Sequence, residues 1–198
     1  MTRMSPAPLD PRAEPVPLAM GRLGMRLLLL ALGMLFAATL SGYLAIRGGA
    51  QAWPPPGVPK LPAALWISTV LIVVSSVTVQ WAVRGIRRGF QASLRNGLLL
   101  TLLLGVAFLV SQSINWFSLV AVHFTARTNL YGFLFYLLTG LHAAHVLGGL
   151  VPLGVVTAQA WRGAYTAASH SGVEYVAMYW HFLDVVWVIL FAVLMLTS

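Results

Sequence analysis

Five long apolar segments constrain this chain more than any other feature of its sequence. Each segment holds roughly 20 or more residues, which at about 1.5 Å per residue is enough to cross the ~30 Å hydrocarbon core of a bilayer. Apolar and polar residues do not alternate within the segments, so the strands of a membrane barrel are excluded. Because a helix satisfies its own backbone hydrogen bonds inside lipid, the sequence predicts an all-α fold, an integral membrane bundle of five transmembrane helices. The predicted helices cover residues of about 23–46, 61–83, 97–120, 130–157 and 173–196.

The composition agrees with a membrane protein and removes several classes of redox site. Hydrophobic residues make up 59% of the chain and charged residues only 8%, whereas a soluble domain carries about 25% charged residues. The chain contains no cysteine. Disulfides, thiolate-bound metals, iron–sulfur clusters and covalently attached c-type haem are therefore excluded.

The first 20 residues differ from the rest of the chain. They are rich in proline and carry both acidic and basic side chains, a composition typical of a flexible tail. No short apolar region directly follows the start, so we do not expect a cleavable signal peptide. We therefore divide the sequence into a flexible cytoplasmic tail, residues 1–20, and a transmembrane domain, residues 21–198.

The distribution of basic residues predicts the orientation of the bundle. With the N-terminus in the cytoplasm, nine basic residues lie inside and three outside, which accounts for all twelve. The inside set is Arg3, Arg12, Arg22, Arg26, Arg84, Arg87, Arg88, Arg95 and Arg162, and the outside set is Arg47, Lys60 and Arg127. Because basic residues concentrate in cytoplasmic loops, we expect a cytoplasmic N-terminus and an external C-terminus. The same rule explains the net charge of +8 without a nucleic-acid partner, since no basic stretch is interleaved with base-stacking side chains.

Ionisable side chains in the last two segments are the candidate functional residues. An ionisable group at membrane depth is energetically costly, so it is usually paired with another group or has a functional role. His142 and His145 lie three residues apart and share one helix face. His181 and Asp184 have the same spacing in the last segment, and Glu174 lies nearer the inner interface. At about 1.5 Å per residue, His142 and His181 fall at similar depth. We therefore predict a buried polar network of these five residues, in which Asp184 pairs with a histidine across the contact between the last two helices.

Three interpretations of these residues stay open. The first is a satisfied interhelical network that fixes helix register, and the second is a proton relay or a lipid-linked role. The third is a metal or haem site, although the sequence dictates no third ligand beside the two paired histidines. Close helix contacts are also predicted at two faces of small residues spaced four apart. These faces are Gly33, Ala37 and Ser41, and Gly140, Ala144 and Gly148.

Several stretches of the sequence match the motifs of one known family. They are YGF at residues 131–133 with TGLHAAHVLGG at 139–149, and HSGVE at 170–174 with YWHFLDVVW at 179–187. These stretches resemble the sixth-helix motif and the last helix of cytochrome c oxidase subunit III. Residues 61–78 and 99–112 are similar to two earlier blocks of the family, and the likeness covers nearly everything from residue 22 onward.

The resemblance implies the short, five-helix bacterial form of this family, a multi-pass protein of the bacterial inner membrane. It implies a non-catalytic subunit III of a haem–copper terminal oxidase in aerobic respiration, with no catalytic residue and no cofactor of its own. Haem and copper are expected in the partner catalytic subunit, whose assembly and proton uptake this chain would support, and bound phospholipid is expected as well. The five histidines of the chain, too few to ligate two haems and a copper, agree with this role.

Two departures from the family pattern keep other functions open. The first family block usually carries a buried glutamate where alignment places Leu32, and Asn115 stands where an acidic residue is frequent. One alternative is a subunit III-like chain of a nitric oxide reductase or another respiratory complex. The other is an independent proton-coupled transporter that uses His142, His181 and Asp184. The odd number of helices and the missing inverted repeat weigh against the transporter.

Overall fold

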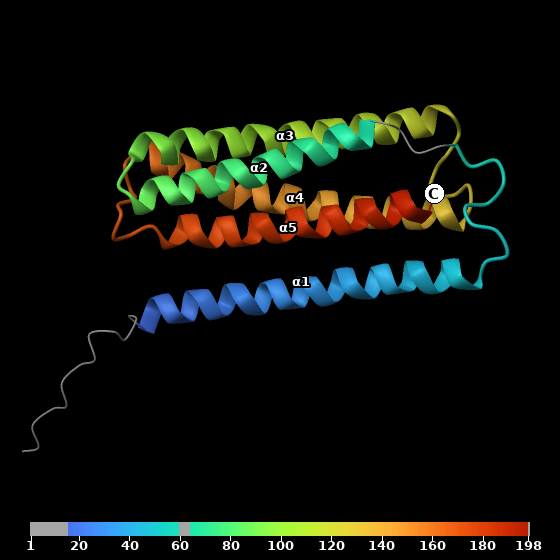
Figure 1. Ribbon diagram of the computed structural model, residues 1–198, viewed down its shortest axis with the longest axis horizontal. Coiled ribbons are helices and arrows are strands. Elements are labelled where there is room, and N and C mark those ends of the chain that lie inside the picture. The colour runs from blue at the N-terminus through green and yellow to red at the C-terminus, as the bar shows by residue number, and fades with distance from the viewer. Residues whose placement is uncertain (1–15, 60–63, 198) are drawn as a thin grey trace, which may run out of the picture.

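The computed structural model describes residues 16–59 and 64–197, and every regular element in these ranges is an α-helix. The helices are α1 (Val16–Gly49), α2 (Ala64–Arg87), α3 (Gln91–Ala121), α4 (Leu130–Trp161) and α5 (Ser171–Thr197) (Figure 1). All five are long and apolar enough to cross a membrane, which confirms the predicted all-α bundle. The chain is therefore a multi-pass membrane protein.

Most of the helices extend beyond the apolar segments that predicted them. α1 begins at Val16, so residues 16–20 are helical, while the rest of the predicted tail and residues 61–63 lie outside the described residues. Only residues 88–90 separate α2 from α3, although the sequence predicted a loop over residues 84–96. Hydropathy marks the part of a helix that lies in hydrocarbon, but helical hydrogen bonding continues into the interface. Most of the arginines assigned to this loop are therefore helical residues.

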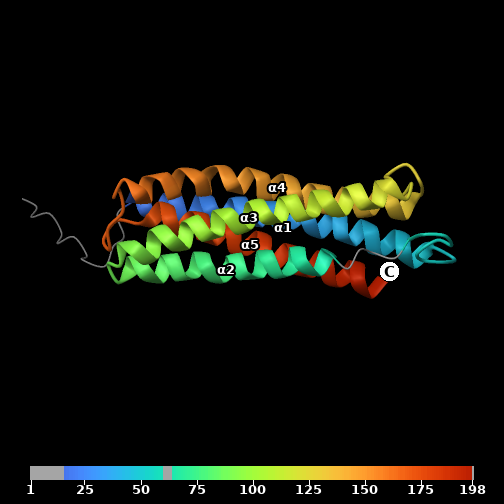
Figure 2. The same ribbon diagram turned by 90° about the horizontal axis from the view of Figure 1, so that it is seen from above.

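Helices α2 to α5 pack into one bundle, and α1 lies along its side (Figure 1). Figure 2 shows α2 and α4 at opposite edges of this bundle, with α3 and α5 between them. Within the described ranges α1 contacts α5 and α4 but neither α2 nor α3. Since α1 is also the least buried helix, much of its apolar surface is not covered by the rest of the described bundle.

Close backbone packing occurs at glycines other than those predicted. A Cβ added to Gly97 of α3 would lie 2.8 Å from the Cβ of Ala82 and 2.9 Å from the carbonyl oxygen of Thr78, both on α2. Only glycine allows this approach. A Cβ added to Gly140 or Gly148 would instead meet no atom within 4 Å. The predicted small-residue face of α4 therefore points away from the described bundle. The sequence could not show this, because residue spacing defines a helix face but not the neighbour that the face meets.

Basic residues gather at one end of the bundle. The start of α1, the α2–α3 turn and the α4–α5 loop all lie at this end (Figure 1), which we call the basic end. The described basic residues near it are Arg22, Arg26, Arg84, Arg87, Arg88, Arg95 and Arg162, whereas Arg47 and Arg127 lie near the opposite end. The side of the membrane that the basic end faces stays a prediction, and the positive-inside rule assigns it to the cytoplasm.

Candidate functional site

Glu174 lies at the basic end and joins three helices. Arg87 of α2 donates hydrogen bonds to Glu174 Oε1, from Nη2 at 2.7 Å and from Nε at 3.2 Å. His170 Nε2 lies 3.3 Å from the same oxygen, and Arg22 Nη2 of α1 lies 3.6 Å from Oε2. The carboxylate also sits in the first turn of α5, where the helix dipole favours negative charge. Glu174 therefore ties the ends of α1, α2 and α5 together and takes no part in contacts with the deeper histidines.

His181 of α5 hydrogen-bonds to α2. Its Nε2 lies 3.1 Å from Gln80 Oε1, and its Nδ1 lies 2.7 Å from Ser76 Oγ. An amide oxygen can only accept, so Nε2 carries the proton and Nδ1 accepts from the Ser76 hydroxyl. The half-buried imidazole thus uses both of its nitrogens in holding α2 and α5 in register.

His142 is enclosed by aromatic rings at the centre of the bundle. The side chain is fully buried, and the ring centroids of Trp187, Phe108 and Phe36 lie 5.0, 5.6 and 6.3 Å from its own. Neither ring nitrogen has a hydrogen-bond partner among the described residues. The half-buried His145 places Nδ1 2.7 Å from a carbonyl oxygen one turn earlier in α4. Neither imidazole therefore hydrogen-bonds to α5.

Asp184 is 4% exposed, and neither of its carboxylate oxygens has a hydrogen-bond partner in the part of the chain that the structure describes. The Ser76 hydroxyl of α2 faces this carboxylate, but the hydroxyl is bonded to His181. The structure thus does not form the predicted pair between Asp184 and a histidine of α4. The reason is the rotation of α5, which turns His181 and Asp184 towards α2 and directs the Tyr179 hydroxyl to a backbone carbonyl of α4.

The five residues of the predicted network therefore occupy three separate places. Glu174 lies in the ion-pair cluster at the basic end, His181 and Asp184 lie at the α2–α5 contact, and the two α4 histidines lie near the bundle centre. Over the described ranges, no three His, Cys, Asp or Glu side chains come together in a way that could hold a metal ion. The hydrogen bonds of Glu174 and His181 agree with the first interpretation, contacts between helices that fix their register.

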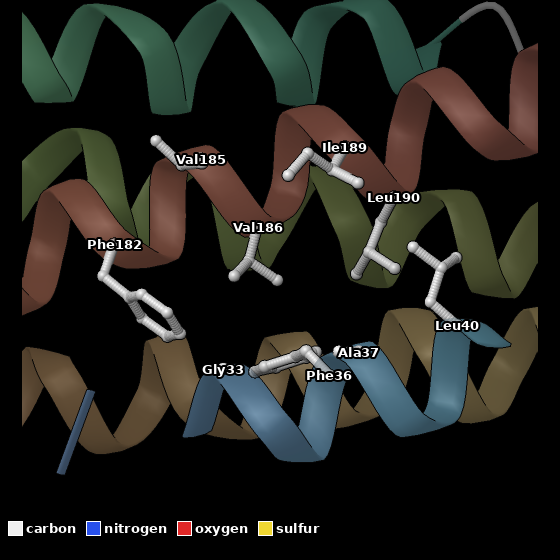
Figure 3. Close-up of a pocket in the computed structure, with 9 residues that line it drawn as sticks. All are labelled: Gly33, Phe36, Ala37, Leu40, Phe182, Val185, Val186, Ile189 and Leu190. Atoms are coloured by element: carbon white, nitrogen blue, oxygen red, sulfur yellow. The ribbon is translucent and has the colours of Figure 1, made fainter. Parts of the chain in front are cut away.

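An apolar groove lies between α1 and α5 (Figure 3) and has a volume of about 260 Å³. Its lining residues are Gly33, Phe36, Ala37 and Leu40 of α1 and Phe182, Val185, Val186, Ile189 and Leu190 of α5. Figure 3 shows the side chains of Phe182 and Val186 pointing from α5 towards α1. The small-residue face predicted around Gly33 lines this groove, where a Cβ would meet only Phe182, at 3.8 Å. A lining without polar side chains suits an acyl chain.

A second groove, which we call the polar groove, lies between α2 and α5 towards the basic end and has a volume of about 570 Å³. Its lining residues are Ser76, Val77, Gln80, Trp81 and Arg84 of α2 and His181 of α5. A neighbouring cavity of about 130 Å³ shares Gln80 and His181 and extends to Arg87 and Glu174. Polar side chains thus continue from the basic end into the depth of the bundle.

Sequence reasoning did not single out the α2 residues of the polar groove. Ser76 and Gln80 lie inside the predicted second segment, and Arg84 was assigned to a loop. One signal was available, because Gln80 is the only amide side chain between residues 61 and 83. A polar side chain at membrane depth marks a candidate functional surface in the same way as an ionisable one.

Comparisons with known proteins agree with the motif resemblance. A family model described as cytochrome c oxidase subunit III matches residues 18–198. A cytochrome c oxidase subunit 3 of Synechocystis is 35% identical over 173 residues, which are 85% of this chain and 72% of the relative. A cytochrome c oxidase subunit 3 of Thermostichus vulcanus is 32% identical over 173 residues, 87% of this chain and 85% of the relative.

A third relative, a probable cytochrome c oxidase subunit 3 of Mycobacterium leprae, is 36% identical over 162 residues, 81% of this chain and 80% of the relative. The family match includes α2 to α5 complete and nearly all of α1. The likeness therefore concerns the whole transmembrane bundle and not one motif. On these grounds the chain belongs to the cytochrome c oxidase subunit III family.

Proposed function

We propose that this chain is the non-catalytic subunit III of a haem–copper terminal oxidase that serves aerobic respiration. The observation that carries the proposal is the family match over residues 18–198, because it includes the whole described bundle except the first two residues of α1. Relatives from several bacteria are named as cytochrome c oxidase subunits. The partner is then the catalytic subunit, and the complex lies in the bacterial inner membrane.

The donor set of this chain supports assigning the haem and copper to the catalytic subunit. The chain has no cysteine and five histidines. Inside the described helices, His142 is packed among aromatic rings, His145 faces its own backbone and His181 is bonded to α2. These three imidazoles lie in different surroundings, and a haem or copper site requires ligands that converge on one point.

The outer face of α4 supports a role in assembly. Gly140, Ala144 and Gly148 lie on this face, and the space beside the two glycines is open. Exposed Leu147 and Val151 flank them. Small residues allow helices of different subunits to approach closely in lipid, where packing and not the hydrophobic effect drives association. We therefore expect a helix of the catalytic subunit to pack against this face.

Two further parts of the structure support the remaining elements of the proposal. The apolar groove between α1 and α5 offers a lining suited to a lipid acyl chain. At the basic end, Glu174 and His170 are ionisable groups close to water, where they could take part in supplying protons to the catalytic subunit. Neither alternative function gains a comparable observation. The relatives are named as subunits of cytochrome c oxidase and not of a nitric oxide reductase. His142, His181 and Asp184 are not hydrogen-bonded to one another as the relay of a transporter would require.

Copurification tests the proposal directly. A tagged form of the chain is extracted from its native membrane in mild detergent, and an untagged strain treated in the same way is the control. We expect a haem-bearing subunit to copurify, and we expect the preparation to consume oxygen when it is supplied with a reduced donor. A haem-free protein recovered alone, or a haem-bearing complex that consumes nitric oxide but not oxygen, would contradict the proposal.

A further inference from the structure

The polar groove presents hydrogen-bond donors that no described residue uses. Gln80 Oε1 is bonded to His181 Nε2, which leaves the two N–H groups of the amide nitrogen of Gln80 to the groove. The indole of Trp81 is an N–H donor and nothing else, and this side chain is 46% exposed and lines the groove. Arg84, also exposed, lines the same groove without an ion pair or side-chain hydrogen bond to a described residue. Apart from the oxygen of Ser76, whose hydrogen is used by His181, the free polar groups of the groove are therefore donors, and one of them carries a positive charge.

These donors lie on one face of α2 that continues as an apolar stripe. Trp81 and Gln80 lie three and four residues before Arg84, so the three side chains follow each other along one helix surface. Beyond them, Val77, Val74, Val73 and Val70 are 66%, 43%, 43% and 58% exposed. From the basic end inwards, the stripe thus presents a cation, then neutral donors about 5 Å deeper, and then bare hydrocarbon.

We propose that the polar groove binds one anionic phospholipid from the membrane leaflet at the basic end. The phosphate lies on the Arg84 guanidinium, the ester carbonyls accept from Gln80 and Trp81, and an acyl chain follows the valine stripe. The phosphate and ester groups of such a lipid are acceptors, which complements a surface of donors. Basic pockets between transmembrane helices are a general means of holding anionic headgroups. The inference deepens the lipid binding in the proposed function and rests on that function for its membrane setting.

A transmembrane helix of another subunit fits the same groove less well. A helix satisfies its own backbone polar groups in lipid, so it would need an acceptor side chain opposite Arg84 and another opposite Gln80. A flexible acyl chain, by contrast, can follow the valine stripe without a matching side-chain pattern. The polar groove is also separate from the apolar groove between α1 and α5, whose lining contains no polar group for a phosphate or an ester.

Two matched variants test the proposal. Arg84→Gln and Arg88→Gln each remove one positive charge from the basic end, but Arg88 follows α2 and lies outside the polar groove and the cavity beside it. The tagged chain, with the subunits that copurify, is washed free of loosely held lipid. Binding of phosphatidylglycerol and of phosphatidylcholine is then measured by native mass spectrometry. We expect the wild type and Arg88→Gln to prefer phosphatidylglycerol, and we expect Arg84→Gln to bind it about tenfold more weakly, because a charge-assisted hydrogen bond is lost.

Further results would support or overturn the proposed lipid site. Arg84→Lys keeps the charge and is expected to retain phosphatidylglycerol, which separates lipid binding from any folding defect of Arg84→Gln. Unchanged binding in Arg84→Gln would overturn the proposal, and so would equal binding of the two lipids by the wild type. A photo-crosslinker at position 77 that captures a protein subunit in place of lipid would also overturn it. Copurifying haem and oxygen consumption are measured on the same preparations, so a failure of the lipid site is distinguishable from a failure of the proposed function.

Discussion

Arg87 of α2 and Glu174 of α5 lie 87 positions apart in the sequence, yet Arg87 donates two hydrogen bonds to one oxygen of the Glu174 carboxylate. The Arg87 side chain is 55% exposed and that of Glu174 is 17% exposed. Arg22 of α1 lies 3.6 Å from the other carboxylate oxygen, so Glu174 also links α5 to α1, the helix that has the fewest contacts with the bundle. The basic end is thus held partly by charge, whereas the middle of the bundle is held by aromatic and small-residue packing and by hydrogen bonds between helices, such as that of Trp180 with Ser75.

Glu174→Gln should weaken the basic end without unfolding the bundle. The substitution removes the negative charge that Arg87, His170 and Arg22 share. Because the pair is partly exposed to water, we expect the free energy of unfolding to fall by about 1 kcal/mol or less. Denaturant titration of the purified protein in detergent measures the change, and a double-mutant cycle with Arg87→Gln isolates the pair. A coupling energy of zero would show that the ion pair does not stabilise the fold.

Gly105→Ala should destabilise the bundle, because its α3 backbone is in contact with a large ring. A Cβ at this position would lie 2.7 Å from Trp180 Cη2 and 2.9 Å from Leu150 Cδ2. Overpacking of this kind costs about 1–3 kcal/mol. The control is Gly154→Ala, where a Cβ meets no atom within 4 Å and no loss of stability is expected. Equal midpoints of unfolding for the two variants would contradict the packing seen here.

The hydrogen bond from Trp180 Nε1 to Ser75 Oγ, 2.8 Å long, should couple α5 to α2. We expect the double-mutant cycle of Trp180→Phe and Ser75→Ala to give a coupling energy of about 0.6 kcal/mol and below about 2 kcal/mol, the range measured for such bonds in membranes. A second cycle pairs Trp180→Phe with Ser111→Ala, whose hydroxyl is bonded to Ser68. Because Trp180 and Ser111 share no hydrogen-bond partner, the changes in unfolding free energy caused by the two substitutions should add.

Asp184→Asn should be tolerated, because the structure shows no hydrogen-bonded or ionic partner that the substitution would break in the described chain. The amide is nearly the same size as the carboxyl group, and we expect the free energy of unfolding to change by less than about 1 kcal/mol. Thermal unfolding of the purified variant measures the change. A loss of about 3–5 kcal/mol, which is typical of a broken buried ion pair, would instead reveal a cationic partner for Asp184.

Single cysteine substitutions should establish the orientation, since the chain contains no cysteine of its own. Arg88→Cys lies at the basic end and Arg127→Cys at the opposite end. Under the positive-inside rule, a membrane-impermeant thiol reagent should label position 127 in cells with an intact inner membrane and position 88 only after that membrane is opened. The reverse pattern would place the N-terminus outside.

The number and type of helices could be predicted because they depend on local properties. Each of the five apolar segments exceeds the length that a bilayer requires, and lipid leaves a backbone of that length no alternative to the helix. The motifs at residues 139–149 and 179–187 also identified the family that the comparisons show. The predicted positions of the helix ends were less accurate, because α1 and α3 continue past the hydrocarbon boundary that hydropathy detects.

The partners of the polar side chains could not be predicted in the same way. The three-residue spacing of His181 and Asp184 correctly places both on one face of α5, but it does not say which helix that face meets. The choice of α2 over α4 follows from the rotation of α5, which packs Trp180 against Gly105 and Tyr179 against Gly149. Serine is common in transmembrane helices, so Ser76 alone gave no signal that it would be a partner of His181.

The amino-acid sequence by itself therefore determined that this protein is a five-helix membrane bundle, which residues are basic at its ends and which family it belongs to. Hydropathy and motif spacing suffice for these properties, because each property depends only on residues that are close together in the sequence. Only the tertiary structure decided that Glu174 meets Arg87, that His181 meets Gln80 and that Asp184 meets no hydrogen-bond partner in the described chain. Such pairings depend on how each helix is rotated about its own axis, and contacts between residues far apart in the sequence set that rotation.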